Sequence, residues 1–533
     1  MSQTFNVLQY VLPVAVVLGG YIGYFQINFW FRERRFIKLQ GTQRVVKVPT
    51  SLPLGIDIIV TMVHEIKRHR LPEYFRDLFE KLGNTFDMKL LGESSILTRE
   101  PRNIHAILTT QFEDYAGGAA KSLQFGPFLG DAIFTLDGTG WEYSRAILRP
   151  QFTRNQLSQL QNLEEHLQVM MDCIPDGEVV DMQSLFYDLT IDTGTDFLCG
   201  ESCNALERRR NMGRKKEGEY WNQPEDDFAK EFNTSQKHLL YRAILGGQAN
   251  LWNPKELQSA VKFCRTWFDE YVKRAIEDQK SGGTSRWESD DANEKPSKYI
   301  FLKAIAKETQ DPVFLRDSLL NILLAARDTT ASLLAWVFYV LVRYPDVEQR
   351  LRQTILKDFG EGNADDSKPI TFESLKNCQY LRWVLNETLR LYPSVPMSTR
   401  IAVRDTTLPT GGGPDQKQPI FVPKGVTVIY DIYSMHRRVD IWGPDANWFR
   451  PERWGEKRNK GDFNYFDYLP FNGGPRICIG QQFALTEASY TIVRMFQRFK
   501  RFEAAEANEW LDLNLSLTLT VGGKGCHIKC YRS

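Results

Sequence analysis

Helical and strand-like hydrophobic patterns alternate along this chain. Apolar residues recur every three or four positions over residues 75–82, which predicts an amphipathic helix, and residues 86–97 predict a short hairpin. Helical patterns then dominate over residues 141–399, interrupted by polar stretches at 207–219 and 281–297 that we interpret as exposed loops. The expected fold is therefore mainly helical with small β-sheets, an α+β class.

The C-terminal segment has a different period. Leucines alternate with polar residues over 513–520, ahead of a glycine-rich stretch at 522–525, which predicts a strand running into a hairpin. Cys526 and Cys530 flank His527, but no second ligand cluster follows, so a zinc site is not favoured.

The N-terminus lacks charge over residues 1–31 and is mostly apolar from residue 7 onward. About 20 such residues cross the hydrocarbon core of a membrane. Positive charges follow the apolar stretch instead of preceding it, which favours a retained transmembrane anchor over a cleaved signal peptide. Because positive flanks face the cytosol, we expect a single-pass protein with a cytosolic body.

Domain boundaries follow from this anchor. The basic stretch after it contains Pro49 and Pro53, which predict a linker over 32–54 and a catalytic domain over 55–533. With 533 residues, 42% of them apolar, the chain can bury one large core. A formal net charge of +1 gives no reason to expect a nucleic-acid partner.

Eight cysteines are spread thinly along the chain, which is not a disulfide framework and fits a reducing compartment. The arginine- and lysine-rich stretch 208–216 has two interpretations: contact with anionic lipid headgroups, or an ordinary solvated loop.

The most specific motif is FNGGPRICIG, residues 471–480. Cys478 lies in a glycine-rich turn before an apolar helical pattern. Backbone N–H groups of the turn and the positive end of the helix would favour its thiolate, which is a strong metal ligand. A buried cysteine in an ordinary loop is the alternative.

This motif matches FxxGxRxCxG and resembles the haem-thiolate monooxygenases of the cytochrome P450 superfamily. The resemblance implies that Cys478 binds haem iron. Gly474 and Gly480 would let the backbone approach the flat macrocycle, Phe471 would pack beside the ligand, and Arg476 would meet a haem propionate.

Other motifs of the superfamily follow in the expected order. ETLR at 387–390 and FRPERW at 449–454 resemble the segments whose Glu387, Arg390 and Arg453 form a buried ion triad beneath the haem. The triad would hold the scaffold and take no part in catalysis. An isolated ExxR on a surface helix is the alternative.

The segment AARDTT, residues 325–330, resembles the oxygen-activation segment of the superfamily. Thr329 would hydrogen-bond dioxygen and position water, and Asp328 would feed the proton relay. Ala326 stands where the superfamily often has glycine, so a methyl group would narrow the groove or reduce local distortion of the helix.

Two further arginines resemble propionate contacts. Trp141 and Arg145 form the pattern WxxxR on a predicted helix, and Arg400 follows Pro396 at the matching position. His436 either assists there or is simply structural.

The resemblance also implies cofactors and partners. Heme b would activate O2, and NADPH would supply electrons through a separate NADPH-cytochrome P450 reductase, because the chain has no dinucleotide-binding GxGxxG motif. The reductase would dock on basic residues near the proximal side, unless these are merely solvated: Arg149, Arg154, Lys457, Arg458 and Lys460.

The substrate is expected to be lipophilic. The sequence around the motifs resembles that of fungal n-alkane and fatty-acid hydroxylases. This resemblance implies a long-chain aliphatic substrate and terminal hydroxylation. It also implies a location in the endoplasmic reticulum membrane, in contact with membrane lipid. Candidate lining residues for an apolar channel are Phe125, Phe128, Leu324, Val395, Met397, Leu517 and Leu519.

Two other functions compete with a monooxygenase. One is a haem-dependent isomerase or peroxide-rearranging enzyme that needs no reductase, against which Asp328 and Thr329 argue. The other is a membrane-bound binding or scaffold protein in which Cys478 is structural.

Overall fold

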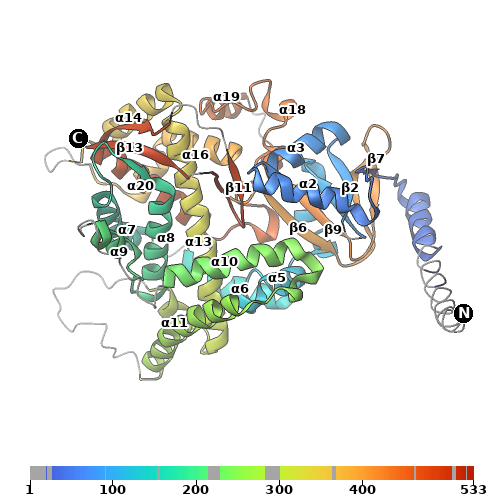
Figure 1. The fold of residues 1–533 in the computed structure, drawn as a ribbon, viewed down its shortest axis with the longest axis horizontal. Coiled ribbons are helices and arrows are strands. Elements are labelled where there is room, and N and C mark those ends of the chain that lie inside the picture. Colours follow the sequence, from blue (N-terminus) through green and yellow to red (C-terminus); the bar gives the residue numbers. More distant parts are fainter. Residues whose placement is uncertain are drawn as a thin grey trace, which may run out of the picture.

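The computed structural model describes residues 20, 24, 27–90, 92–152, 156–213, 228–281, 300–362, 368–460, 464–506, 512–523 and 525–532. Helices fill one half of the molecule, and the largest sheet lies in the other half with two helices beside it (Figure 1). The helical content and the small sheets confirm the expected class.

The largest sheet has six strands in the order β1-β2-β3-β9-β6-β4. It mixes parallel pairs (β1 with β2, β3 with β9) and antiparallel pairs (β2 with β3, β6 with β9, β4 with β6). The strands are β1 (Val46–Lys47), β2 (Thr85–Leu90), β3 (Glu93–Thr98), β4 (Tyr115–Ala116), β6 (Met397–Ala402) and β9 (Thr427–Asp431). The β2–β3 pair is the hairpin predicted over 86–97.

Smaller sheets complete the strand content of the described residues. They pair β10 with β13 and β13 with β5, β11 with β12, and β7 with β8. Their bounds are β5 (Val179–Asp181), β7 (Thr406–Gly412), β8 (Gln418–Val422), β10 (Phe499–Ala504), β11 (Leu513–Leu515), β12 (Leu519–Val521) and β13 (His527–Arg532).

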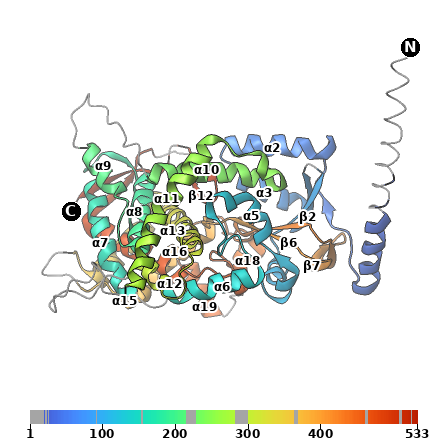
Figure 2. The ribbon, with the colours of Figure 1, turned by 90° about the horizontal axis from the view of Figure 1, so that it is seen from below.

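The long helix α13 (Pro312–Leu341) runs through the helical half (Figures 1 and 2). It begins where the Asp311 side chain accepts a hydrogen bond from the Val313 N–H at 2.9 Å, which caps the helix end. Its apolar residues are buried almost all round, and Trp336 stacks on Tyr392 with ring centroids 4.1 Å apart. A helix apolar on every side must lie in the core, and α13 does.

The other helices surround α13 or cover the sheet. They are α2 (Ile56–Lys67), α3 (Leu71–Leu82), α4 (Pro101–His105), α5 (Gly118–Leu129), α6 (Gly138–Leu148), α7 (Gln156–Asp172), α8 (Met182–Cys199), α9 (Ala205–Gly213), α10 (Phe228–Leu245), α11 (Lys255–Lys280), α12 (Phe301–Ala306), α14 (Pro345–Phe359), α15 (Phe372–Asn377), α16 (Gln379–Leu391), α17 (Ile432–Met435), α18 (Val439–Trp442), α19 (Arg453–Lys460) and α20 (Gln481–Arg498).

The short helical turns are η1 (Pro53–Gly55), η2 (Ala106–Thr110), η3 (Phe112–Asp114), η4 (Arg149–Phe152), η5 (Gly246–Leu251), η6 (Tyr465–Asp467) and η7 (Gly474–Arg476). Of these, η2 has π-helical geometry and η7 lies inside the cysteine motif.

The expected single strand over residues 513–520 is wrong. The chain turns back at residues 516–518, so β11 pairs with β12 and Leu513 lies opposite Val521. Ser516 and Thr518 stabilise the turn, because the Ser516 N–H donates to the Thr518 carbonyl at 3.0 Å. Apolar and polar residues alternate through both strands and the turn between them, so the pattern alone does not show the reversal.

Two other segments differ from expectation. The stretch 207–219 was expected to be a loop, but its first residues belong to α9, where Arg209 pairs with Asp188. The stretch 32–54 was expected to be a linker, yet it contributes β1 to the large sheet. A two-residue strand is too short to leave a periodic signal.

Membrane-spanning potential is limited in the described residues. No single helix among them is long and apolar enough for a span, and α13 with α14 meets that test only as a pair bent by 113°. The predicted anchor, residues 1–31, lies mostly outside the described residues.

Candidate functional site

Cys478 lies in the turn between η7 and α20. Its N–H donates to the Phe471 carbonyl at 3.0 Å, which closes the loop 471–478. Cys478 is the exposed cysteine of the chain; the other seven are buried or half-buried. Solvent therefore reaches Cys478 in a way that it does not reach a cysteine packed into a core, although protein atoms surround most of its sulfur.

The electrostatics of the thiol have opposing causes. Desolvation by the surrounding protein raises the pKa of Cys478, while the Gly480 N–H and the Arg145 charge lower it. Desolvation is the largest of these effects, so the net pKa of Cys478 is raised. The turn and Arg145 are therefore not sufficient to keep the sulfur as a thiolate. A cation bound at the sulfur would deprotonate it outright.

Gly474 is required by packing in the cysteine loop. It has a φ of +64°, and a Cβ at this position would lie 1.9 Å from the Leu108 carbonyl oxygen of η2. At Gly480 the nearest atom to such a Cβ belongs to Phe152, at 3.8 Å. Protein packing thus explains Gly474, and leaves Gly480 with space that a ligand can use.

Arginines predicted from separate motifs converge beside this loop. Arg476 lies over the Trp141 ring, 4.4 Å from its centroid, and Arg145 lies 5.7 Å from the same ring. Arg145 also donates to the Ile477 carbonyl at 3.1 Å, next to the cysteine. Arg400 of β6 is buried and lowers the pKa of Arg476 to about 10 together with desolvation, the larger cause.

Beside these arginines lie two residues that the sequence patterns did not reveal, an anion and a further cation. Asp137, before α6, accepts from Arg476 at 2.7 Å and from the Gly117 N–H at 3.1 Å. Desolvation and the charges of Arg400 and Arg476 lower the pKa of Lys121 to about 7. Neither residue belongs to a periodic or spaced motif, so only the fold associates them.

The cation group fits the two propionates of a haem. Desolvation, and after it mutual repulsion, lowers the pKa of Lys121 and Arg476, and the buried Arg400 Nε has no hydrogen-bond partner among the described residues. A buried guanidinium nitrogen without a partner costs free energy that a carboxylate would recover. An accessible thiol beside incompletely neutralised cations is a set of groups that fits a haem.

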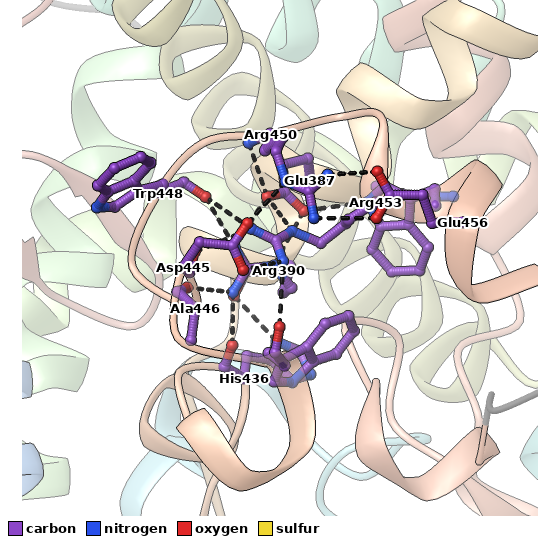
Figure 3. Close-up of polar contacts among 12 residues, drawn as sticks. Glu387, Arg390, His436, Asp445, Ala446, Trp448, Arg450, Arg453 and Glu456 are labelled. Carbon is purple, nitrogen blue, oxygen red and sulfur yellow. Dashed lines mark hydrogen bonds and ion pairs between the residues drawn. The ribbon is translucent and has the colours of Figure 1, made fainter.

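The Glu387 carboxylate is the centre of a closed ion network (Figure 3). It accepts from Arg390 Nε at 2.9 Å and Nη2 at 2.8 Å, and from Arg453 Nε at 2.8 Å. The Arg450 N–H and the Trp454 indole also donate to it. The three residues expected to form a triad thus meet, and all are buried.

The remaining N–H groups of Arg390 and Arg453 bind the segment 436–448, which precedes the cysteine loop 471–478. Arg390 donates to the carbonyls of His436, Ala446 and Trp448, and Arg453 pairs with Asp445 at 3.2 Å (Figure 3). Satisfying these carbonyls fixes a segment that has little regular structure of its own.

His436 connects the network to the cysteine motif. Its Nε2 accepts from the Leu469 N–H at 2.9 Å, and its Nδ1 lies 3.1 Å from the Arg390 carbonyl. Burial lowers its pKa well below the ordinary value, so the ring is neutral. These contacts favour the structural interpretation of His436.

On α13, Asp328 and Thr329 point to different partners. Asp328 is buried, pairs with Arg327 at 3.0 Å and accepts from Gln236 of α10 at 2.7 Å. Desolvation is the main cause that raises its pKa. The half-buried Thr329 donates to the Ala325 carbonyl at 2.7 Å, one helical turn back, and thereby leaves its oxygen as an acceptor.

Ala326 lies within an unbroken helix. Residues 312–341 are helical throughout, and Ala326 is half-buried. The expectation that the methyl group accompanies an undistorted helix agrees with this geometry.

The candidate lining residues fall into three groups. Phe125, Phe128, Leu324 and Leu517 share one apolar cluster. Met397 and Leu519 lie in two other clusters, and Val395 is exposed. Among the candidate docking residues, Arg149 begins η4, whereas Arg154 and the side chains of Lys457, Arg458 and Lys460 lie outside the described residues.

Comparison with known proteins decides the family. The family model for Cytochrome P450 matches residues 50–523. The chain belongs to the cytochrome P450 family. It is 46% identical over 452 residues to Cytochrome P450 52A12 of Debaryomyces hansenii, covering 84% of each chain. It is 42% identical over 524 residues to Cytochrome P450 52E1 of Candida apicola, covering 96% of this chain and 98% of the relative.

A third relative is Cytochrome P450 52A3-B of Candida maltosa, 44% identical over 513 residues, or 94% of this chain and 95% of the relative. Membership confirms the expected activity: this cytochrome P450 is a haem-thiolate monooxygenase that acts on hydrophobic substrates. It uses heme b, O2 and electrons from NAD(P)H, which reach it through NADPH-cytochrome P450 reductase.

Proposed function

We propose that this cytochrome P450 hydroxylates the terminal carbon of long-chain fatty acids or n-alkanes at the endoplasmic reticulum membrane, and that Cys478 would hold the haem iron. The observation that carries the site assignment is the accessible Cys478 thiol beside incompletely neutralised cations. Residues 1–31 would be the anchor, and the domain from residue 55 would face the cytosol.

Each residue around the haem has a distinct part in this proposal. Cys478 binds the iron, and the Gly480 N–H points to its sulfur. Arg400, Arg476 and Arg145 hold the propionates, with Trp141 packed against two of these guanidinium groups. Haem when bound supplies the oxidant that an unactivated C–H bond requires, which side chains alone do not provide.

Thr329 and Asp328 of α13 would deliver protons on the side of the haem opposite Cys478. The Thr329 hydroxyl oxygen, with its own hydrogen directed to the Ala325 carbonyl, would hold a water molecule by accepting a hydrogen bond from it. Asp328 supplies the proton, and its raised pKa keeps a larger protonated fraction than an exposed aspartate has.

A long aliphatic substrate is supported by the apolar cluster that contains Phe125, Phe128, Leu324 and Leu517. Excluding water from such a surface favours an alkyl chain by about 0.8 kcal/mol for each buried CH2 group. The similarity to proteins named Cytochrome P450 52 supports the same substrate class.

Membrane attachment is supported by exposed apolar residues at the edge of the molecule. Trp30, Phe31 and Leu39 are exposed on the helical residues 27–40, and Val60 and Val63 are exposed on α2. Large apolar side chains gathered near an apolar N-terminus favour contact with lipid.

The first experiment is the absorbance spectrum of the purified protein, reduced under carbon monoxide. We expect a long-wavelength Soret band in the parent and in Cys173→Ala, a matched control at a half-buried cysteine, and its loss in Cys478→Ala. A folded Cys478→Ala protein that kept the band would refute the assignment of the ligand.

A second experiment addresses the substrate and the membrane. Saturated fatty acids and n-alkanes are incubated with NADPH and reductase, and products are analysed for the position of the hydroxyl group. Oxidation confined to internal carbons would contradict terminal hydroxylation. Removal of residues 1–31 should retain the Soret band while reducing sedimentation with microsomes; unchanged sedimentation would contradict the anchor.

A further inference from the structure

Gln236 of α10 contacts both charged residues that precede Thr329 on α13. Its Nε2 donates to Asp328 Oδ2 at 2.7 Å, and its Oε1 accepts from Arg327 Nη1 at 3.1 Å. The same Nη1 donates to Asp328 Oδ1 at 3.0 Å. The one amide thus donates to a carboxylate and accepts from a guanidinium, whereas an ionised glutamate can only accept and a lysine can only donate.

Both oxygens of Asp328 are engaged by this arrangement. Arg327 takes Oδ1 and Gln236 takes Oδ2, so the plane of the carboxyl group depends on the position of each partner. Arg327 is itself held: its guanidinium lies 4.6 Å from the Tyr187 ring centroid of α8 and 5.7 Å from that of Phe232 on α10. Consequently α10 contributes directly and indirectly to the orientation of Asp328.

The position of α10 is fixed at its other end by Arg242. This fully buried guanidinium donates to the carbonyls of Leu123 and Gln124 on α5 at 2.7 Å and 2.8 Å, and to that of Trp252 at 2.7 Å. Figure 1 shows α10 beside α5 and crossing α13. Gln236 therefore lies between a helix that carries candidate substrate contacts and the helix that carries Asp328.

An apolar contact also links α5 to α10. Phe128 of α5 and Phe232 of α10 meet edge to face, with ring centroids 5.4 Å apart, within the apolar cluster proposed to receive the substrate. Movement of α5 or α10 around a substrate would displace Gln236 relative to α13.

We infer that Gln236 is a positioning residue that orients Asp328 for proton delivery, so that productive proton delivery depends on where α10 lies over α13. This inference rests on the proposed role of Asp328. Gln236 lies outside the oxygen-activation segment, on a different helix, and acts through the Asp328 carboxyl group.

Three variants test the role in the full-length haem protein. Gln236→Leu removes both hydrogen bonds, and Gln236→Glu places a negative charge against Asp328 while keeping the acceptor for Arg327. Asn233→Asp makes the same amide-to-acid change on the exposed face of α10 and is the matched control. Product, NADPH consumed and peroxide released are measured per haem.

We expect both Gln236 variants to lower product formed per NADPH by about ten-fold and to raise peroxide, because a misplaced acid delivers protons poorly. Asn233→Asp should match the parent. Normal coupling in both Gln236 variants, with an unchanged reduced carbon monoxide spectrum, would overturn the inference and leave the proposed function intact. An absent spectrum in the parent would instead refute the proposed function.

A double variant separates positioning from stability. In Gln236→Glu with Asp328→Asn the donor and acceptor are exchanged, so the interhelical hydrogen bond can re-form with the opposite polarity. We expect thermal unfolding to return towards that of the parent, relative to Gln236→Glu alone, while product per NADPH stays low. Recovery of both quantities would show that Asp328 is not the proton source, which would refute its proposed role and the inference that rests on it.

Discussion

Glu387 and Asp328 are both buried carboxylates paired with arginine, but their surroundings differ. Glu387 accepts hydrogen bonds from Arg390 of α16, from Arg453 and Trp454 of α19, and from the Arg450 N–H just before α19. Asp328 has one partner on its own helix and one on α10, and the neighbouring Arg327 Nε has no partner among the described residues. The first network holds a scaffold, and the second leaves room for adjustment.

This difference fits the roles proposed for the two carboxylates. A fully satisfied charge is expensive to move, because every displaced donor would be left buried without a partner. A proton donor must change its charge and its hydrogen bonds during turnover, so a lightly held carboxyl group is suited to that task. Four predictions test the contrast, from the largest expected change in stability to the smallest.

Glu387→Gln should destabilise the protein most. An amide nitrogen would face two guanidinium groups and leave buried positive charge unpaired, at a cost of about 3–5 kcal/mol in the free energy of unfolding. Urea unfolding and haem content per protein measure this. The exposed pair of Glu452 and Arg350, 2.8 Å apart, gives the matched control: Glu452→Gln should cost less than about 1 kcal/mol. Equal losses of unfolding free energy in Glu387→Gln and Glu452→Gln would contradict the scaffold role of Glu387.

Glu487 of α20 should make stability depend on pH. Burial raises its pKa from 4.5 to about 7, against the Thr193 hydroxyl and the His166 charge, which lower it. The folded protein therefore holds this proton longer than the unfolded chain does. Its contribution to stability is complete below pH 4.5 and is lost as the pH rises through about 7.

Glu487→Gln removes that loss. Above pH 7 the variant should exceed the parent in unfolding free energy by at most about 3 kcal/mol, and the difference should shrink towards pH 4.5. Urea unfolding at several pH values measures it, with the exposed Glu113→Gln as control. A difference that did not vary with pH would show that Glu487 does not titrate in this range.

Gly474→Ala should distort the cysteine loop. The added Cβ would collide with the Leu108 carbonyl and occupy a positive φ, costing about 1–3 kcal/mol and lowering haem retention. Gly480→Ala, where the added atom meets open space and Phe152, should leave the unfolding of the haem-free protein unchanged. Comparable unfolding of the two haem-free variants would contradict this assignment.

Asp328→Asn should affect stability least and catalysis strongly. The amide oxygen still accepts from Arg327, and the cost of burying a charge disappears. The new amide nitrogen faces the Gln236 Nε2 donor, so one hydrogen bond is lost and we expect a change of about 1 kcal/mol. Product per NADPH should fall about a hundred-fold, because the proton source is lost. If unfolding free energy fell as far as in Glu387→Gln, Asp328 would belong to the scaffold.

Much of the site could be predicted because its motifs are local in sequence. Cys478, Arg476 and Gly474 lie within one turn, and Glu387 and Arg390 lie on one face of one helix. Gln236, Lys121 and Asp137 could not be found this way, because each meets its partners from a separate element. The reversal between β11 and β12 also escaped detection, because both strands continue one alternating pattern.

The sequence by itself determined the helical class, the family motifs and the chemistry of the thiol ligand, because these depend on periodicity and on residues close together in the chain. Only the tertiary structure decided which charges are neutralised. It placed Arg400 of β6 beside Arg476 and Lys121, and Gln236 of α10 on Asp328 of α13. The energy of a charge depends on its distance from other charges and from water, which folding sets.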